Sequence, residues 1–273
     1  MDLYQTITDQ IIKKLEEGTV PWRKPYQSSG AISWHTQKPY RGINALMLDD
    51  GEYATFNQIR AAGGKVKKGE KSQLVIFWKL IEKEDDDGEK ETIPLMRYYR
   101  VFEINSQVEG LKSKRETKKF KHKPIEAAEE IVKNYQEPKY KFERAGAFYN
   151  PSEDLINIPP KEDFYDINEY YSTMFHEMAH STGHKDRLNR EGITNMATFG
   201  SETYSKEELV AEITASLLCG ETGIINRTIE NTTAYIQSWL RVLKNDKRLI
   251  VSASQQAQKA ADYIMGRKEW TQK

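Results

Sequence analysis

The sequence His176-Glu-Met-Ala-His180 constrains this chain more than any other feature. Histidines at positions i and i+4 lie one turn apart on the same face of an α-helix, so they can bind one metal ion together. Apolar side chains at helical spacing precede the motif, and Gly183 ends the pattern. The spacing therefore predicts a helix over residues 167–181 with a zinc site on one of its faces.

Glu177 follows the first histidine directly. Its carboxylate can accept a proton from a zinc-bound water, whose pKa the ion lowers to about 7, and can pass that proton to a leaving amine. The motif therefore predicts a zinc peptidase in which His176 and His180 are metal ligands and Glu177 is the catalytic base.

Zinc in a catalytic site needs a third protein ligand, and two candidates compete. Glu208 falls in a second predicted helix, over residues 205–218, and a ligand from a downstream helix is the gluzincin arrangement. Asp186 is the alternative, because His-Glu-x-x-His-x-x-Gly-x-x-Asp also fits this sequence. We favour Glu208 and expect Glu212, one turn further on, to orient a histidine through its other ring nitrogen.

Two further polar residues lie near these helices in the sequence. Tyr204 could donate a hydrogen bond to an oxyanion, although an ordinary packing or surface role is the simpler interpretation. We expect His184 to be an exposed loop residue, with metal binding and substrate contact as the alternatives.

Hydrophobic periodicity predicts an α+β protein of two domains, 1–123 and 124–273, the second mainly helical with a small sheet. The basic run 112–123 separates them as a solvated linker or an additional nucleic-acid contact. The predicted helices cover residues 4–17, 55–62, 125–135, 167–181, 205–218, 231–244 and 253–265. The predicted strands include 74–78, 96–104, 140–144 and two short strands within 147–158, and an acidic hairpin tip is predicted over 82–91.

The net charge of zero hides an asymmetry between the two predicted domains. Residues 1–123 contain 23 Lys and Arg against 18 Asp and Glu, a net charge of +5, and the remaining residues carry −5. Aromatic and basic residues alternate in the first half, as expected where bases stack on rings and phosphates meet cations, so we predict binding of single-stranded DNA. The predicted contact residues are Trp22, Arg23, Lys24, Tyr26, Trp34, Lys38, Tyr40 and Arg41.

Composition narrows the remaining possibilities. No apolar run is long enough to span a bilayer, and the first residues do not resemble a secretory signal, so we expect a cytoplasmic protein without a membrane partner. The single cysteine, Cys219, lies in an apolar helical run and is expected to be a buried structural thiol.

Together the motifs resemble the ArdC-type antirestriction proteins of conjugative plasmids and related mobile elements. The resemblance rests on three N-terminal segments, within 11–26, 39–45 and 53–58, and on three C-terminal segments, 175–184, 207–218 and 252–264. It implies an N-terminal domain that binds single-stranded DNA and a C-terminal zincin-like metallopeptidase domain.

The resemblance also implies a function, which is protection of transferred DNA from host restriction, with an unidentified host protein as the peptidase substrate. The alternative is a non-enzymatic single-stranded-DNA-binding protein with a structural zinc site. The acidic insert 82–91 matches no motif of the family and argues against a uniformly basic DNA-binding surface.

Overall fold

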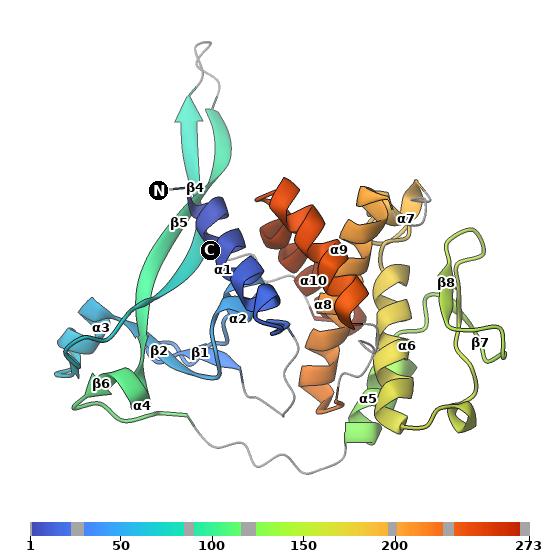
Figure 1. Ribbon diagram of the computed structural model, residues 1–273, viewed down its shortest axis with the longest axis horizontal. Coiled ribbons are helices and arrows are strands. Elements are labelled where there is room, and N and C mark those ends of the chain that lie inside the picture. The colour runs from blue at the N-terminus through green and yellow to red at the C-terminus, as the bar shows by residue number, and fades with distance from the viewer. Residues whose placement is uncertain are drawn as a thin grey trace. The chain divides into compact units, whose positions relative to one another are not determined.

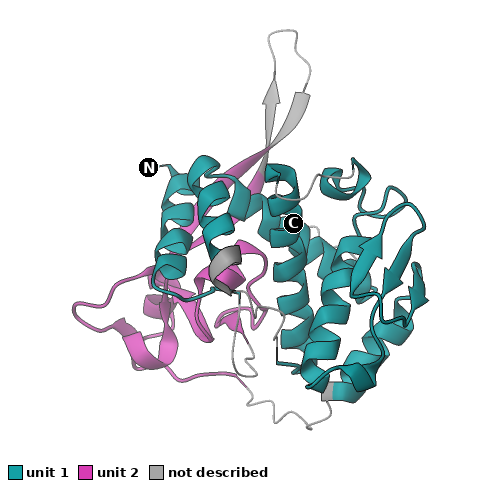
Figure 2. Ribbon diagram, turned by 45° about the vertical axis from the view of Figure 1, so that its right-hand side comes forward, with its two compact units in different colours: residues 1–28, 119–269 teal, residues 29–118, 270–273 magenta. Residues whose placement is uncertain are grey.

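The structure is a computed structural model that describes residues 2–22, 30–84, 90–115, 124–195, 201–225 and 232–267. The chain forms two compact units (Figure 2). Unit 1 contains residues 1–28 and 119–269, and unit 2 contains residues 29–118 and 270–273. The boundary predicted after Lys123 falls close to the second junction, but the first 28 residues belong to the unit formed by the C-terminal half.

Unit 1 is built on two long helices, α6 (Ile167–Ser181) and α8 (Glu202–Thr222), which pack against each other (Figure 1). Each begins with a polar cap: the Asp166 carboxylate accepts from the backbone N–H of Asn168, and Ser201 accepts from that of Tyr204. The last turn of α8 ends at Gly223, whose φ of 79° is the left-handed conformation that glycine tolerates best. These caps fix the limits of the two helices that carry the motif residues.

A three-stranded sheet in the order β7-β9-β8 lies beside α6 (Figure 1). Its strands are β7 (Lys139–Lys141), β8 (Phe148–Asn150) and β9 (Leu155–Asn157), with β9 parallel to β7 and antiparallel to β8. The core between these elements includes fully buried Met174 and Phe175 from α6. Unit 1 is therefore the predicted helix-rich domain with a small sheet.

The remaining helices of unit 1 are α5 (Pro124–Asn134), α7 (Glu191–Thr194), α9 (Thr232–Asn245) and α10 (Leu249–Ile264), with a short 3₁₀ turn at Lys161–Asp163. The N-terminal helix α1 (Leu3–Glu16) also joins them and packs against α9 and α10. Its buried face, with Ile7, Ile11 and Leu15, is the predicted apolar stripe. This stripe explains why the first residues belong to unit 1.

Unit 2 contains a four-stranded sheet in the order β1-β2-β5-β4. The two long strands, β4 (Gln73–Glu84) and β5 (Lys90–Glu103), form an antiparallel hairpin, as predicted, and part of its acidic tip lies outside the described residues. The strands β1 (Ala31–Ser33) and β2 (Gly51–Thr55) are parallel to each other and complete the sheet. The smaller elements are α2 (Ile43–Met47), α3 (Phe56–Ala61), α4 (Ile104–Gln107) and the paired strands β3 (Lys65–Val66) and β6 (Val108–Glu109).

Each face of this sheet carries its own small core. One cluster contains Tyr53 and Val75, and the other contains Trp34 and Ala54. The start of the predicted linker is also part of unit 2, because the backbone N–H of Lys114 donates to the buried Glu52 carboxylate at 2.9 Å. The first residues of the basic run are therefore ordered on unit 2, while residues 116–123 lie outside the described part of the chain.

Candidate metal centre

Three side chains from α6 and α8 converge on one point in unit 1. The Nε2 atoms of His176 and His180 lie 3.0 Å apart, and the Glu208 carboxylate oxygens lie 3.4 Å from the first and 3.5 Å from the second. The histidines point the same way because they are one turn apart on α6, and the packing of α8 brings the glutamate to them. Within the described residues, these three form the group that could hold a metal ion.

The geometry fits a divalent metal. Ligand atoms about 2.0–2.1 Å from a tetrahedral ion lie roughly 3.3 Å from one another, close to the three measured separations. Two imidazoles and one carboxylate are suitable donors, and three protein ligands leave a position free for water. Two ring nitrogens 3.0 Å apart share at most one proton between them, so at least one of the two offers a lone pair to a metal ion.

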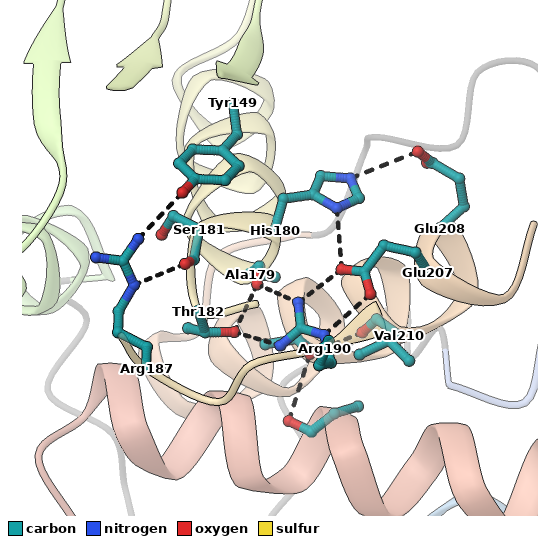
Figure 3. Close-up of polar contacts among 12 residues, drawn as sticks. Tyr149, Ala179, His180, Ser181, Thr182, Arg187, Arg190, Glu207, Glu208 and Val210 are labelled. Carbon is teal, nitrogen blue, oxygen red and sulfur yellow. Dashed lines mark hydrogen bonds and ion pairs between the residues drawn. The ribbon is translucent and has the colours of Figure 1, made fainter. Parts of the chain in front are cut away.

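Two further carboxylates face the outer ring nitrogens of the histidines. Glu207 Oε1 lies 3.3 Å from His180 Nδ1, and Glu212 Oε1 lies 3.5 Å from His176 Nδ1 (Figure 3 shows the contact at His180). The His176 contact is an ion-pair distance rather than a hydrogen bond, since the buried Nδ1 atom has no hydrogen-bond partner. The predicted position of Glu212 beside a histidine agrees with this arrangement, whereas Glu207 is a contact that the spacing did not indicate.

Arg190 holds Glu207 in place. Its guanidinium donates two hydrogen bonds to the Glu207 carboxylate, at 2.6 and 3.0 Å, and others to Thr182 Oγ1 and the Ala179 carbonyl (Figure 3). Arg190 and Glu207 are each 6 % exposed. A bidentate pair of this kind fixes both position and orientation, so the oxygen facing His180 is held by the arginine.

The loop that carries Arg190 packs closely enough on itself, at Gly183, and on α8, at Gly192, to require glycine at both positions. A Cβ atom on Gly183 would lie 2.6 Å from Ile193 Cγ1, and one on Gly192 would lie 2.7 Å from the Cβ of Glu207. Both distances are too short for carbon contacts. The glycines therefore allow residues 182–195 to pack against the helix that supplies Glu207.

Ionisation in this cluster favours a bound cation. Burial raises the pKa of Glu208, but the His176 and His180 rings outweigh burial and hold it far below its usual range. Burial likewise raises the pKa of Glu207, but Arg190 and His180 outweigh burial and hold that pKa below its usual value. Burial lowers the pKa of His180, but Glu207 and Glu208 raise that pKa well above its usual value. The pKa of His176 is also raised, by Glu208 and Glu212 against the effect of burial. The ionised carboxylates supply the negative charge that a metal ion would balance.

The other predicted residues around the motif occupy different environments. Glu177 is 8 % exposed, and its side chain makes no hydrogen bond or ion pair within the described residues, so its carboxylate is available to accept a proton. The side chain of Asp186 is 74 % exposed, and its carboxylate lies 3.5 Å from Nδ1 of His184. The side chain of His184 is largely buried, so the prediction that His184 is an exposed loop residue is wrong. Tyr204 is half-buried in the first turn of α8, one turn before Glu208.

The structure places the predicted DNA-binding residues in several environments. Trp22 is 4 % exposed and packs edge-to-face on Trp239 in unit 1, with ring centroids 5.1 Å apart. Trp34 is 7 % exposed in unit 2, donates from Nε1 to the Lys112 carbonyl at 2.9 Å, and lies under the Lys114 ammonium. Both rings are core side chains, so the structure contradicts the prediction that they stack on bases.

The other predicted contacts differ in exposure. Tyr40 is half-buried and packs edge-to-face on Tyr53, and burial raises the pKa of Tyr40 to about 12. Lys38 is exposed and Arg41 is half-buried. The predicted contacts Arg23, Lys24 and Tyr26 lie outside the described residues.

Comparisons with known proteins find a family match in each half of the chain. Residues 1–102 match the family described as the N-terminal domain of the anti-restriction factor ArdC. Residues 126–256 match the zincin-like metallopeptidase family. No helix within the described residues has the length and apolar character needed to cross a membrane.

Curated relatives match almost the whole chain. Two proteins named DNA primase TraC, from Escherichia coli, are each 33 % identical over 96 % of this chain, which spans only 20 % and 27 % of their lengths. The uncharacterized protein y4eC from Sinorhizobium fredii is 30 % identical, and the match covers 96 % of this chain and 91 % of that protein.

Solved structures extend the likeness to the fold. A metal-free crystal structure of the antirestriction protein ArdC from plasmid R388 is 36 % identical, with a TM-score of 0.79, over 98 % of this chain and all of that one. A Mn(II)-bound structure of the same protein has the same identity and TM-score over 97 % of this chain and 98 % of that one.

Proposed function

Because this chain belongs to the ArdC family of antirestriction proteins, we propose that it protects the transferred DNA of a mobile element from host restriction, binds single-stranded DNA, and is a zinc peptidase. The site of these events would be the cytoplasm of the cell that receives the DNA. The observation that carries the enzymatic part is the convergence of His176, His180 and Glu208 beside an unpaired Glu177.

Zinc is the metal that the donor set favours. Two imidazoles and a carboxylate with a free fourth position are the ligands of catalytic zinc sites, and manganese, found in the related crystal structure, binds such sites more weakly. His176, His180 and Glu208 would hold the ion. Glu207 and Glu212 would fix the two ring orientations through the outer nitrogens.

A zinc ion held by His176, His180 and Glu208 would supply an acidified water and would polarise the scissile carbonyl of an unidentified host protein. Glu177 accepts the proton of that water and delivers it to the leaving amine. Tyr204, one turn before Glu208 on α8, would be the candidate donor of a hydrogen bond to the oxygen that becomes negative. A site that lacks Glu177 should therefore bind zinc but not cleave peptides.

The test uses zinc-loaded full-length protein and a library of fluorogenic peptides. We expect Glu177→Gln to lower cleavage by at least about 100-fold, because general-base catalysis contributes on that order, while zinc content and oligo(dT) binding stay unchanged. The matched control is Glu169→Gln, which removes a carboxylate near the start of the same helix and should leave cleavage at the wild-type rate.

Two results would contradict this assignment. Loss of zinc from Glu177→Gln would mean that Glu177 supports the metal rather than acting as a base. Absence of cleavage by the zinc-loaded wild-type protein, together with a large fall in melting temperature when zinc is removed, would favour a DNA-binding protein with a structural zinc site.

A further inference from the structure

One face of the β4–β5 hairpin continues beyond the small core of unit 2. In the ladder, Val75 lies opposite Tyr99 and Phe77 lies opposite Arg97. Directly opposite residues share a face, as do residues two apart on one strand, so Lys79 belongs to the same face. Val75 is buried in the core, and the residues further along the hairpin extend past it. We call Phe77, Lys79, Arg97 and Tyr99 the β4–β5 platform.

The aromatic pair of the platform is arranged differently from the aromatic pairs of the cores. The rings of Phe77 and Tyr99 are stacked, with centroids 4.6 Å apart and planes 7° from parallel, and Tyr99 is 52 % exposed. The rings of Tyr40 and Tyr53, in one core of unit 2, meet edge-to-face, and Tyr53 is only 1 % exposed. A parallel pair with so much exposed surface adds little to the core and presents a flat apolar surface to a ligand.

The platform carries two positive charges that are unpaired within the part of the chain that the structure describes. Lys79 and Arg97 are exposed, and neither side chain makes a hydrogen bond or ion pair with any residue in the described ranges. The four ladder pairs from Gln73 with Val101 to Lys79 with Leu95 place no Asp or Glu on this face. By contrast, Arg115 elsewhere in unit 2 is paired with Asp50 at 2.8 Å. Two free cations beside an open ring are complementary to a phosphate backbone that carries exposed bases.

We infer that the β4–β5 platform binds single-stranded DNA, with a base stacked on Tyr99 and phosphates contacting Arg97 and Lys79. Phe77 supports the Tyr99 ring from the other side. Single strands are selected over duplexes because a flat ring binds the face of a base, which duplex stacking covers. The inference rests on the proposed function and assigns its DNA contact to a sheet surface rather than to Trp22 and Trp34.

The first test measures the affinity of the full-length protein for fluorescein-labelled oligo(dT) by anisotropy at fixed salt. Tyr99→Ala should weaken binding by about 5- to 150-fold, the range found when a base loses the aromatic side chain on which it stacks, and Tyr99→Phe should bind like wild type. The matched control is Tyr98→Ala, which removes a ring that is 44 % exposed on the opposite face of the same strand and should bind like wild type.

The second test measures the same affinity over a range of salt concentrations. Arg97→Ala and Lys79→Ala should each lower the slope of log K against log salt by about 0.7, the value for one phosphate contact on a single strand. Both side chains are exposed, so thermal melts should show that these variants fold like wild type even if Tyr99→Ala does not.

The outcomes separate this inference from the proposed function. Wild-type affinity and salt slope in Tyr99→Ala and Arg97→Ala, with oligo(dT) binding intact in the wild type, would overturn the platform alone. An equal loss in Tyr98→Ala would do the same. Failure of the wild-type protein to bind oligo(dT) would overturn DNA binding as a function, and the platform with it.

Discussion

Two patterns are prominent in the sequence: the candidate metal centre of unit 1, and the aromatic, basic segment that begins at Trp22. They differ in how well the sequence pattern predicts the positions of the side chains. The candidate metal ligands converge, because His176 and His180 lie on one helix and helix geometry alone sets their separation. The positions of the aromatic rings do not follow from their pattern, because the exposure of a ring depends on what the rest of the chain packs against it. Trp34, for example, is covered by the carbonyl of Lys112, 78 residues away.

The difference shows which sequence patterns can be interpreted without a tertiary structure. A spacing within one element specifies which side chains converge. An alternation of aromatic and basic residues specifies composition only, and buried and exposed tryptophans have the same composition.

The largest expected effect is the loss of stability when one of the two buried tryptophans is truncated. We expect Trp34→Ala to lower the free energy of unfolding by about 3–5 kcal/mol, because truncation of a buried tryptophan loses its apolar burial and leaves a cavity. Trp34→Phe keeps a ring in the core and should cost about 1 kcal/mol for the lost Nε1 hydrogen bond. Urea unfolding monitored by circular dichroism measures both values.

The same variants distinguish packing from DNA contact. If Trp34 were a stacking residue, Trp34→Ala would fold with wild-type stability and bind oligo(dT) more weakly. Trp22→Ala provides the equivalent comparison in unit 1, where we expect a similar loss of stability from removal of its contact with Trp239.

The next effect is a change in zinc affinity when a carboxylate beside an outer ring nitrogen is removed. Glu207→Gln should weaken zinc binding by about 10- to 100-fold, because a carboxylate on the outer nitrogen of His180 raises the basicity of that ligand. Glu212→Gln is the matched variant at His176 and should act in the same direction. Competition with a chromophoric chelator gives the affinities, and wild-type values for both variants would show that these carboxylates do not support the ligands.

The smallest effect compares the loop residues that the sequence predicts with the β4–β5 platform. Lys38 is exposed and stays a candidate phosphate contact, so Lys38→Ala should weaken oligo(dT) binding about twofold and lower the salt slope by at most about 0.7. If Lys38→Ala lowered the oligo(dT) affinity more than Arg97→Ala does in the same anisotropy titration, the main DNA contact would lie in the loop and not on the β4–β5 platform.

Much of the fold follows from local patterns. The predicted helix over residues 167–181 coincides with α6, and the paired strands around Asn150 and the β4–β5 hairpin are also confirmed. The short strands β1 and β2 were missed because three and five residues are too few for an alternating pattern to stand out. The apolar stripe of α1 predicts a helix, but it does not indicate which unit the helix joins.

The candidate site likewise has a part that local sequence patterns predict and a part that they do not. The i, i+4 spacing indicated His176 and His180, and helical periodicity led to Glu208. The pair formed by Arg190 and Glu207 could not be predicted, because it joins a loop to a helix and depends on the close approach at Gly192. The one local signal was an arginine shortly after the motif, and surface arginines are too common in sequences for that signal to be informative.

The most direct test of the metal centre is the zinc content of purified protein, measured by mass spectrometry after dialysis against a weak chelator. The ligand set predicts one zinc per chain in the wild type and in Asp186→Ala, and almost none in Glu208→Ala, which retains only the two histidines. Zinc retained by Glu208→Ala and lost from Asp186→Ala would contradict the assignment of Glu208 as the third ligand.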